Sequence, residues 1–239
     1  LDFMALKTYP PSDGEPRGVG EHPHRGFETV TILHQGEVEH RDSAGNKGRI
    51  GPGDVQWMTA ASGVVHEEKH SLAFTQKGGA FEGAQLWVNL PAKLKMSKPR
   101  YQDLAGRQIP AVPLPGGGGT VRVIAGSFQG RKGPAETYTP LNLWDVQLQA
   151  GAAAEFALDE GHSLIVLVFR GSVTFNGDTD ADAAELAVFE RRGERLTVTA
   201  KEPPTTGRPE AYTGGIGSGF ELRAELVPAK AQVGDPMTL

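Results

Sequence analysis

The sequence predicts an all-β protein built from two tandem β-barrels. Its 32 glycines and 17 prolines make up about a fifth of the 239 residues and fall at short intervals between runs of β-branched residues. This distribution is typical of short strands joined by tight turns. The two halves also resemble each other weakly, because residues 31–59 and 166–200 both read as strand, turn, strand, loop and strand. Such an echo is expected of a duplicated barrel or sandwich.

The expected strands follow one another along the chain with few helical candidates between them. Each is rich in Val, Ile, Thr or aromatic residues and is bounded by Gly, Pro, Asn or Asp. The segment SAGNKG, residues 43–48, is a turn between two of them, and the one run with a helical tendency is DADAAELAVFE, residues 180–190. The expected strands are residues 28–33, 36–43, 54–59, 63–68, 84–90, 120–126, 141–149, 154–158, 163–175, 184–190 and 195–200.

A segment rich in proline and glycine divides the chain near its middle. Residues 109–119 read IPAVPLPGGGG, in which the prolines stiffen the first part and the glycines free the end. We therefore expect an N-terminal domain over residues 1–110 and a C-terminal domain over residues 120–239, with residues 109–119 as the linker between them.

Composition excludes several classes of function. The net charge is -5 with basic and acidic residues mixed along the chain, so no basic stripe is available for direct nucleic-acid binding. The absence of cysteine excludes disulfides and thiolate metal sites. The longest apolar run, Leu164–Phe169, is far shorter than the roughly 20 residues that span a bilayer. We expect no membrane association, a cytoplasmic location as the default, and a monomer.

Two pairs of ligand-type residues in the first half have strand spacing. In a strand, His22 and His24 would share one face about 7 Å apart at the backbone. His66 and Glu68 would also share a face, with Glu67 on the other. Either pair alone is more often found in a turn or on a surface. Together, three imidazoles and one carboxylate with open coordination positions are typical of a catalytic mononuclear metal site.

Other residues near these pairs have several candidate roles. Glu28 would face inward in an unbroken strand, but a bulge at Gly26 would change that. It is a candidate ligand, general base, or acceptor that orients an imidazole. Four further residues have strand positions that could line a pocket: Gln56, Met58, Gln85 and Trp87. The remaining histidines lack such partners and are interpreted as polar strand, loop or structural residues: His34, His40, His70 and His162.

The stretch HPHRGFETVTILHQGEVEHRDSAGNKGRIGPGDVQWMTAASGVVHEE, residues 22–68, resembles the pirin signature. Residues 85–104, QLWVNLPAKLKMSKPRYQDL, resemble the segment that follows it. Pirins belong to the cupin superfamily, so the resemblance implies two tandem cupin barrels of jelly-roll type, of which only the first keeps a metal. It also implies that the metal ligands are His22, His24, His66 and Glu68.

The same resemblance implies a chemistry. Some pirins open the heterocyclic ring of quercetin between carbons 2 and 3 with release of carbon monoxide, so we expect a metal-dependent dioxygenase that cleaves a flavonol or related enol with O₂. Glu68 or Glu28 would take the proton from the flavonol 3-hydroxyl. We expect one divalent transition metal per chain, Fe(II) first, with Cu, Mn, Ni, Co and Zn as alternatives. The other function left open is a metal- or redox-dependent regulator that binds a transcription factor or a metabolic enzyme.

Overall fold

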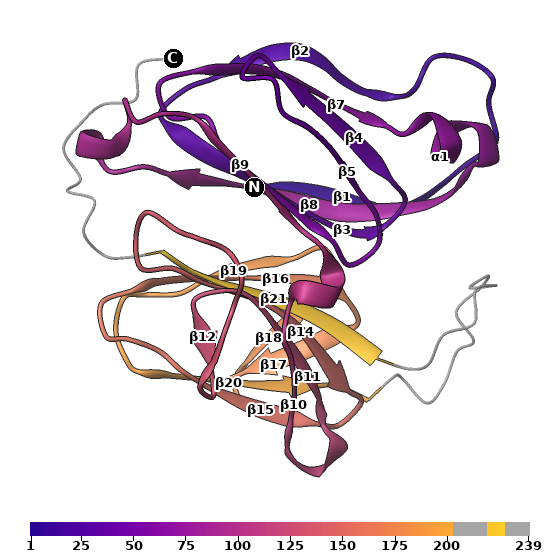
Figure 1. Ribbon diagram of the computed structural model, residues 1–239. Coiled ribbons are helices and arrows are strands. Elements are labelled where there is room, and N and C mark those ends of the chain that lie inside the picture. The colour runs from indigo at the N-terminus through magenta and orange to yellow at the C-terminus, as the bar shows by residue number, and fades with distance from the viewer. Residues whose placement is uncertain (203–218, 228–239) are drawn as a thin grey trace. The chain divides into compact units, whose positions relative to one another are not determined.

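The computed structural model describes residues 1–202 and the backbone of residues 219–227 (Figure 1). The regular secondary structure of the described residues is almost entirely antiparallel β-sheet, which confirms the all-β prediction. No helix in the described ranges has the length and apolar character needed to cross a membrane. The helical elements are α1 (Leu72–Lys77) and three short 3₁₀ turns, η1 (Ala92–Leu94), η2 (Gly106–Gln108) and η3 (Pro115–Gly117).

The chain forms two compact units. The first comprises Leu1–Ile109 and Pro134–Tyr138, and the second comprises Pro110–Gly133 and the chain from Thr139 onward. The first unit has two antiparallel sheets. One has the order β1 (Asp2–Tyr9), β8 (Gly79–Asn89), β3 (Phe27–Gln35), β6 (Val55–Thr59) and β9 (Arg100–Leu104), and the other has the order β2 (Gly18–His24), β7 (Val64–His70), β4 (Val38–Asp42) and β5 (Lys47–Ile50).

The second unit also contains two larger antiparallel sheets and one small ribbon. The first sheet has the order β10 (Ala111–Pro113), β11 (Gly119–Ala125), β14 (Asn142–Gln149), β21 (Gly219–Val227), β16 (Ser163–Arg170) and β19 (Leu186–Val188). The second has the order β15 (Ala153–Ala157), β20 (Arg195–Ala200), β17 (Ser172–Phe175) and β18 (Thr179–Asp182). The ribbon pairs β12 (Ser127–Phe128) with β13 (Arg131–Lys132).

In the second unit an apolar core fills the space between the two sheets. Alternate residues of β11 and β14 in one sheet, and of β15 and β20 in the other, point inward, so Val121 and Trp144 meet Phe156 and Val198 in a single cluster. The rings of Trp144 and Phe156 stack with their centroids 5.7 Å apart. The ladders of the described strands leave the sheets open at their edges, so each unit is a two-layer sandwich of the jelly-roll type and not a closed barrel.

The strand expected over residues 184–190 is present as β19, which pairs with Ile165 to Leu167 of β16. The helical tendency of residues 180–190 is not realised, because this segment forms β18, a turn and β19, and cross-strand pairing fixes its backbone. Helix α1 is not indicated by the sequence pattern. It begins after Ser71, whose hydroxyl accepts from the N–H of Phe74 at 3.0 Å, and it ends at Gly78 with φ 67°.

The segment predicted as a linker contains ordered structure. Ala111 of β10 pairs with Arg122 of β11, so part of residues 109–119 belongs to a sheet of the second unit. The division into a domain over residues 1–110 and another over residues 120–239 stays a prediction.

At Gly18 the backbone of β2 lies so close to that of β7 that a larger side chain would not fit. Gly18 has φ 149°, and a Cβ at this position would lie 2.2 Å from the backbone oxygen of Glu68. We expect Gly18→Ala to lower the free energy of unfolding by about 1 to 3 kcal/mol, because the strands must separate or the backbone must strain. Urea unfolding followed by circular dichroism measures the change.

Gly20 of the same strand is the matched control, because a Cβ there would meet nothing within 4 Å. Gly20→Ala should leave the free energy of unfolding within about 0.5 kcal/mol of the parent value. Equal effects of the two substitutions would show that the close approach at Gly18 has no energetic weight.

Candidate metal centre

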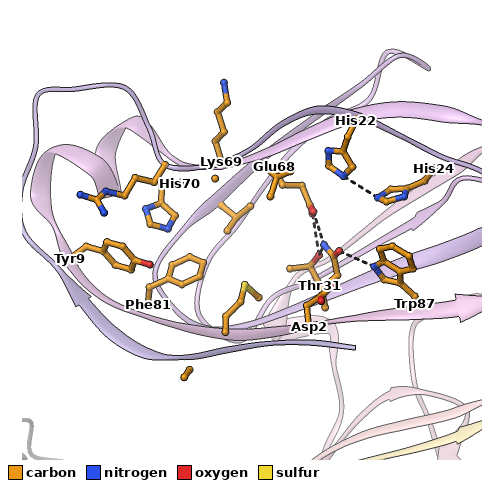
Figure 2. A pocket seen from close by; sticks show the side chains of 17 residues that line it. Asp2, Tyr9, His22, His24, Thr31, Glu68, Lys69, His70, Phe81 and Trp87 are labelled. Carbon is orange, nitrogen blue, oxygen red and sulfur yellow. Dashed lines mark hydrogen bonds between the residues drawn. The ribbon is translucent and has the colours of Figure 1, made fainter. Parts of the chain in front are cut away.

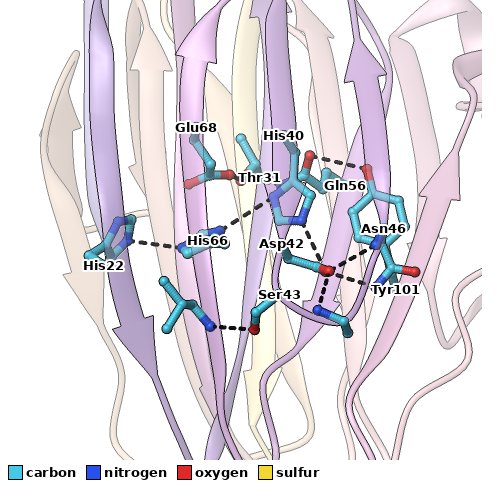
Figure 3. Close-up of polar contacts among 12 residues, drawn as sticks. His22, Thr31, His40, Asp42, Ser43, Asn46, Gln56, His66, Glu68 and Tyr101 are labelled. Atoms are coloured by element: carbon cyan, nitrogen blue, oxygen red, sulfur yellow. Dashed lines mark hydrogen bonds and ion pairs between the residues drawn. The ribbon is translucent and has the colours of Figure 1, made fainter.

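Three histidines from two neighbouring strands converge on one point. His22 and His24 share a face of β2, and the β2–β7 register sets His22 directly opposite His66. The Nε2 atoms of His22 and His24 are 3.0 Å apart, and those of His66 and His22 are 2.9 Å apart (Figures 2 and 3). Strand alternation, which the sequence predicts, places His22 and His24 on one face, and the β2–β7 register brings His66 to them.

The hydrogen bond of His22 indicates which nitrogen is free. Its Nδ1 lies 2.8 Å from the backbone oxygen of Gly20, and a carbonyl can only accept, so Nδ1 carries the proton. The Nε2 lone pair of His22 is then directed at the Nε2 atoms of His24 and His66. Two nitrogens bound at right angles to one metal, each about 2.1 Å from it, would be about 3.0 Å apart. The observed spacing fits a metal ion.

The environment favours the neutral form of two of these imidazoles, those of His24 and His66. Burial, followed by the neighbouring His22, lowers the pKa of His24. Burial, with the charges of His22, His40 and His24, lowers the pKa of His66 to about 3, although Asp42 opposes the shift. Neutral imidazole is the form that binds a metal, so a transition-metal ion fits this donor set.

Glu68 is held in place by three donors. Its Oε1 accepts from the Thr31 hydroxyl at 3.2 Å and from the Gln56 amide at 2.8 Å, and its Oε2 accepts from the Gln85 amide at 2.6 Å. The donors belong to β3, β6 and β8, in the sheet opposite β7, so Glu68 bridges the two layers of the sandwich. Its place in the site is therefore fixed by its own strand, β7, and by three donors from the opposite sheet.

The ligand atoms fall into two overlapping groups. In one, the donor atoms of His22, His24 and His66 all lie within 4.8 Å of one another; in the other, those of His40, His66 and Glu68 do. His66 belongs to both groups. The structure thus brings Glu68 to His66 but places it at the margin of the three converging histidines.

Glu28 is not part of either group. It alternates along β3 with Thr29 and Thr31, so it lies on the face opposite the one from which Thr31 contacts Glu68. Its Oε1 accepts from the Thr59 hydroxyl at 2.6 Å. Gly26, with φ 81°, turns the chain between His24 and β3 and resets the alternation. A catalytic role for Glu28 stays a prediction that no contact in this site supports.

A cavity of about 720 Å³ opens onto the histidines. One end is formed by His22, His24 and Glu68 together with Thr31 and Trp87. Figure 2 shows a second end away from these residues, where aromatic rings gather. The rings at that end belong to Tyr9, His70 and Phe81.

The other predicted pocket residues separate into two kinds. Gln85 and Trp87 line the cavity, and Gln56 reaches Glu68 from behind it. Met58 packs with Ala60 and Val64 in an apolar cluster and takes no part in the site.

Sequence reasoning misses His40. Its pattern alone indicates a polar strand or loop residue, yet it is 1% exposed and its Nδ1 lies 3.3 Å from Nδ1 of His66. The signal that could have indicated it is the pattern His-Arg-Asp, residues 40–42, directly before the turn at residues 43–48, because it places Asp42 on the same strand face as His40.

Comparison with known proteins finds similarity to pirins and to a protein named as a quercetin 2,3-dioxygenase. The family model described as Pirin matches residues 2–88, and that of the Pirin C-terminal cupin domain matches residues 143–206. A Pseudomonas aeruginosa protein named "Putative quercetin 2,3-dioxygenase" is 53% identical over 84% of this chain and 69% of its own length. A Caulobacter vibrioides pirin-like protein is 43% identical over 77% of this chain and 64% of its own. The chain thus spans about two thirds of these relatives.

Solved structures agree with the fold. The crystal structure of a quercetin 2,3-dioxygenase from Acinetobacter baumannii has a TM-score of 0.85 and 40% identity, covering 95% of this chain and 73% of that one. The Escherichia coli pirin YhhW in complex with nickel(II) has a TM-score of 0.65 and 20% identity, covering 88% of this chain and 76% of that one. The second likeness is one of fold alone. Both sandwich units therefore have the cupin architecture expected from the sequence.

Glu28 yields a prediction on the pH dependence of stability. Burial raises the pKa of this carboxyl above its ordinary value of 4.5, although Thr59 and Arg100 oppose the shift. Above pH 4.5 the folded state therefore holds this proton more tightly than the unfolded state does, and stability falls as pH rises through the raised pKa. Glu28→Gln keeps the acceptor for Thr59 and removes the charge. We expect the difference in free energy of unfolding, Glu28→Gln minus parent, to become larger as the pH rises from 4.5 to 8.

Unfolding curves at several pH values measure this change, and Glu15→Gln, at an exposed position, is the control that should run parallel to the parent. Metal content should not change in Glu28→Gln, since the side chain faces away from the histidines. A fall in metal content would contradict this orientation of the side chain and return Glu28 to the site.

Proposed function

This chain belongs to the pirin family of cupin proteins, and we propose that it is a mononuclear metal enzyme of the quercetin 2,3-dioxygenase type. Its substrate would be a flavonol or a related enol, cleaved with O₂. The observation that supports this proposal most directly is the convergence of the His22, His24 and His66 Nε2 atoms beside a cavity large enough for a small molecule. The name of the 53% identical Pseudomonas relative supports the same reaction class.

The proposed metal ligands are His22, His24, His66 and Glu68. Fe(II) is the first choice for a set of imidazole and carboxylate donors with open positions, although such a set also accepts Mn, Co, Ni, Cu or Zn. When bound, the metal would supply Lewis-acid and redox chemistry to an oxygen-bearing substrate. The protein would hold the three imidazoles in fixed positions, and the cavity beside them would leave room for a substrate.

Glu68 is the residue that we assign to the substrate proton. A flavonol must lose the proton of its 3-hydroxyl to become electron-rich toward O₂, and a carboxylate within the cavity is a suitable acceptor. The amides of Gln56 and Gln85 and the hydroxyl of Thr31 hold Glu68 in one orientation. Such preorganisation keeps the acceptor at the place where the hydroxyl would lie.

The walls of the cavity suit a flat aromatic substrate. Trp87 stacks on Phe27 with centroids 4.7 Å apart and stands 5.2 Å from the His24 ring, which forms an aromatic wall beside the histidines. Phe81 and Tyr9 form a second aromatic surface at the other end. Aromatic faces of this kind bind planar ligands by offset or edge-to-face contact.

The alternative function, a regulator that binds a transcription factor or metabolic enzyme, stays a prediction. A regulatory metal can be enclosed by protein, whereas an enzyme needs a cavity that reaches its metal. His22, His24 and Glu68 all line the 720 Å³ cavity, and this favours the enzyme.

The proposal is tested by oxygen uptake. Protein loaded with Fe(II) without oxygen and then mixed with air and a panel of flavonols should consume O₂ and release carbon monoxide. Glu68→Gln should lower kcat by about 100-fold or more, as expected when a positioned base is lost. Glu67→Gln is the matched control, since Glu67 lies on the other face of β7 and pairs with Lys69 at 3.1 Å; it should leave turnover unchanged.

Metal analysis is run on the same samples. A protein that binds metal but consumes no O₂ with any flavonol would contradict the oxygenase and leave the regulator. Unchanged metal content and unchanged turnover in Glu68→Gln would remove Glu68 from both of its proposed roles.

A further inference from the structure

A buried chain of hydrogen bonds runs from His66 away from the histidine cluster, through His40, to Asp42 (Figure 3). We propose that His40 and Asp42 are positioning residues that fix the tautomer of His66, so that its Nε2 lone pair is directed at the metal. The inference rests on the proposed metal site. It adds two residues that the ligand set does not contain.

The amide orientation of Gln56 is fixed by two neighbours. Its Nε2 is 2.8 Å from Oε1 of Glu68, and its Oε1 is 3.2 Å from the hydroxyl of Tyr101. A carboxylate only accepts, so the nitrogen must face Glu68. Burial raises the pKa of Tyr101 above its ordinary value, so its hydroxyl keeps the proton that it donates to the amide oxygen.

The same amide assigns the proton on His40. The Nε2 of Gln56 also lies 3.3 Å from Nδ1 of His40, and an amide nitrogen can only donate. The Nδ1 atom of His40 is therefore an acceptor, and the ring proton is on Nε2. That Nε2 lies 3.3 Å from Oδ2 of Asp42, which accepts it. The His40 tautomer is thus supported from both sides of the ring.

His66 must then present a proton to His40. Its Nδ1 is 3.3 Å from the accepting Nδ1 of His40, and two lone pairs at that distance would repel, so the His66 proton lies on Nδ1. This leaves the Nε2 lone pair of His66 free, 2.9 Å from the Nε2 of His22. The ring-proton positions of His40 and His66 are therefore linked, and Asp42 and Gln56 together set them.

Asp42, the last residue of the hydrogen-bond chain, is held in place by further hydrogen bonds. Asp42 begins the turn before β5, where its Oδ1 accepts the backbone N–H groups of Ala44 and Asn46 at 2.9 Å and its Oδ2 accepts the Asn46 amide at 2.8 Å. The side chains of His40 and Asp42 are 0% and 1% exposed. Because water has little access, the protein itself determines which atoms donate. The ring of His40 also stacks on that of Tyr101, with centroids 4.9 Å apart.

Asp42→Asn replaces the acceptor at the end of this hydrogen-bond chain with a donor, and it hardly changes the shape of the side chain. The amide oxygen can keep the two backbone bonds of the turn, but the amide nitrogen then faces two donors, Nε2–H of His40 and the amide of Asn46. Relief at the His40 ring requires its proton to move to Nδ1, where it opposes the Gln56 amide and forces the His66 proton onto Nε2. We expect the affinity for Fe(II) or Co(II), measured anaerobically by competition with a chelator, to fall about 10- to 100-fold.

Asp54→Asn is the matched control. Asp54 also holds a turn, since its Oδ2 accepts the N–H of Gly51 at 2.9 Å and its Oδ1 accepts the N–H of Gly106 at 2.7 Å, but neither contact involves a histidine. It should keep the parent metal affinity. Thermal unfolding of the metal-free proteins reports any general loss of structure in either variant.

His40→Asn distinguishes a positioning role of His40 from a general loss of structure. Its amide oxygen can accept from His66 in place of Nδ1, whereas its short side chain no longer reaches Asp42. We expect a loss of affinity of less than about 10-fold, and we expect Asp42→Asn to have no further effect in the His40→Asn background, because the link is already cut. The visible spectrum of the Co(II) protein should keep its ligand-field bands in His40→Asn, since no ligand is removed.

Each outcome decides the proposal. Parent-like affinity in Asp42→Asn, an equal loss in Asp54→Asn, or an undiminished effect of Asp42→Asn in the His40→Asn background would overturn the positioning role while leaving the metal site intact. A loss of binding in His40→Asn with new Co(II) bands would make His40 a ligand, in the group with His66 and Glu68, and would also overturn it. If the parent binds no metal, the proposed function and this inference both fail.

Discussion

The pairing of β2 with β7 is the constraint on which the site depends. This ladder sets His22 opposite His66, and the alternation along β2 adds His24 on the same face. The close approach at Gly18 lets the two backbones pair near the start of β2. A shift of one residue in this register would turn the histidines of β2 to the other face of the sheet, so the three histidines converge only in one pairing.

Strand alternation made most of the site predictable from the sequence. The spacing of His22 with His24, and of His66 with Glu68, is enough to put each pair on one face, because the period of a strand is two residues. Alternation cannot be carried through an irregular backbone. Gly26, with φ 81°, interrupts the chain between His24 and β3, and so Glu28 lies on the face away from the cluster.

Contacts that depend on register between distant strands were outside the reach of the sequence. His40 meets His66 because β4 pairs with β7 on the side opposite β2, so that three strands of one sheet contribute to a single network. No local pattern fixes that order. The same limit applies to residues 109–119, where proline and glycine indicate a linker but pairing with β11 makes Ala111–Pro113 a strand. Fold class follows from composition and spacing, whereas strand order follows from tertiary packing.

The two sandwiches differ in what fills the space between their sheets. In the second unit the space between the sheets is filled by apolar side chains such as Trp144 and Phe156. In the first, the corresponding face of β7 carries His66 and Glu68, groups that are costly to bury unless each polar atom has a partner. Donors from the facing sheet supply those partners for Glu68, and His40 supplies one for His66. The Nε2 atoms of the three histidines are directed toward one another. A cation bound between them would give these nitrogens the partner that the polypeptide does not provide.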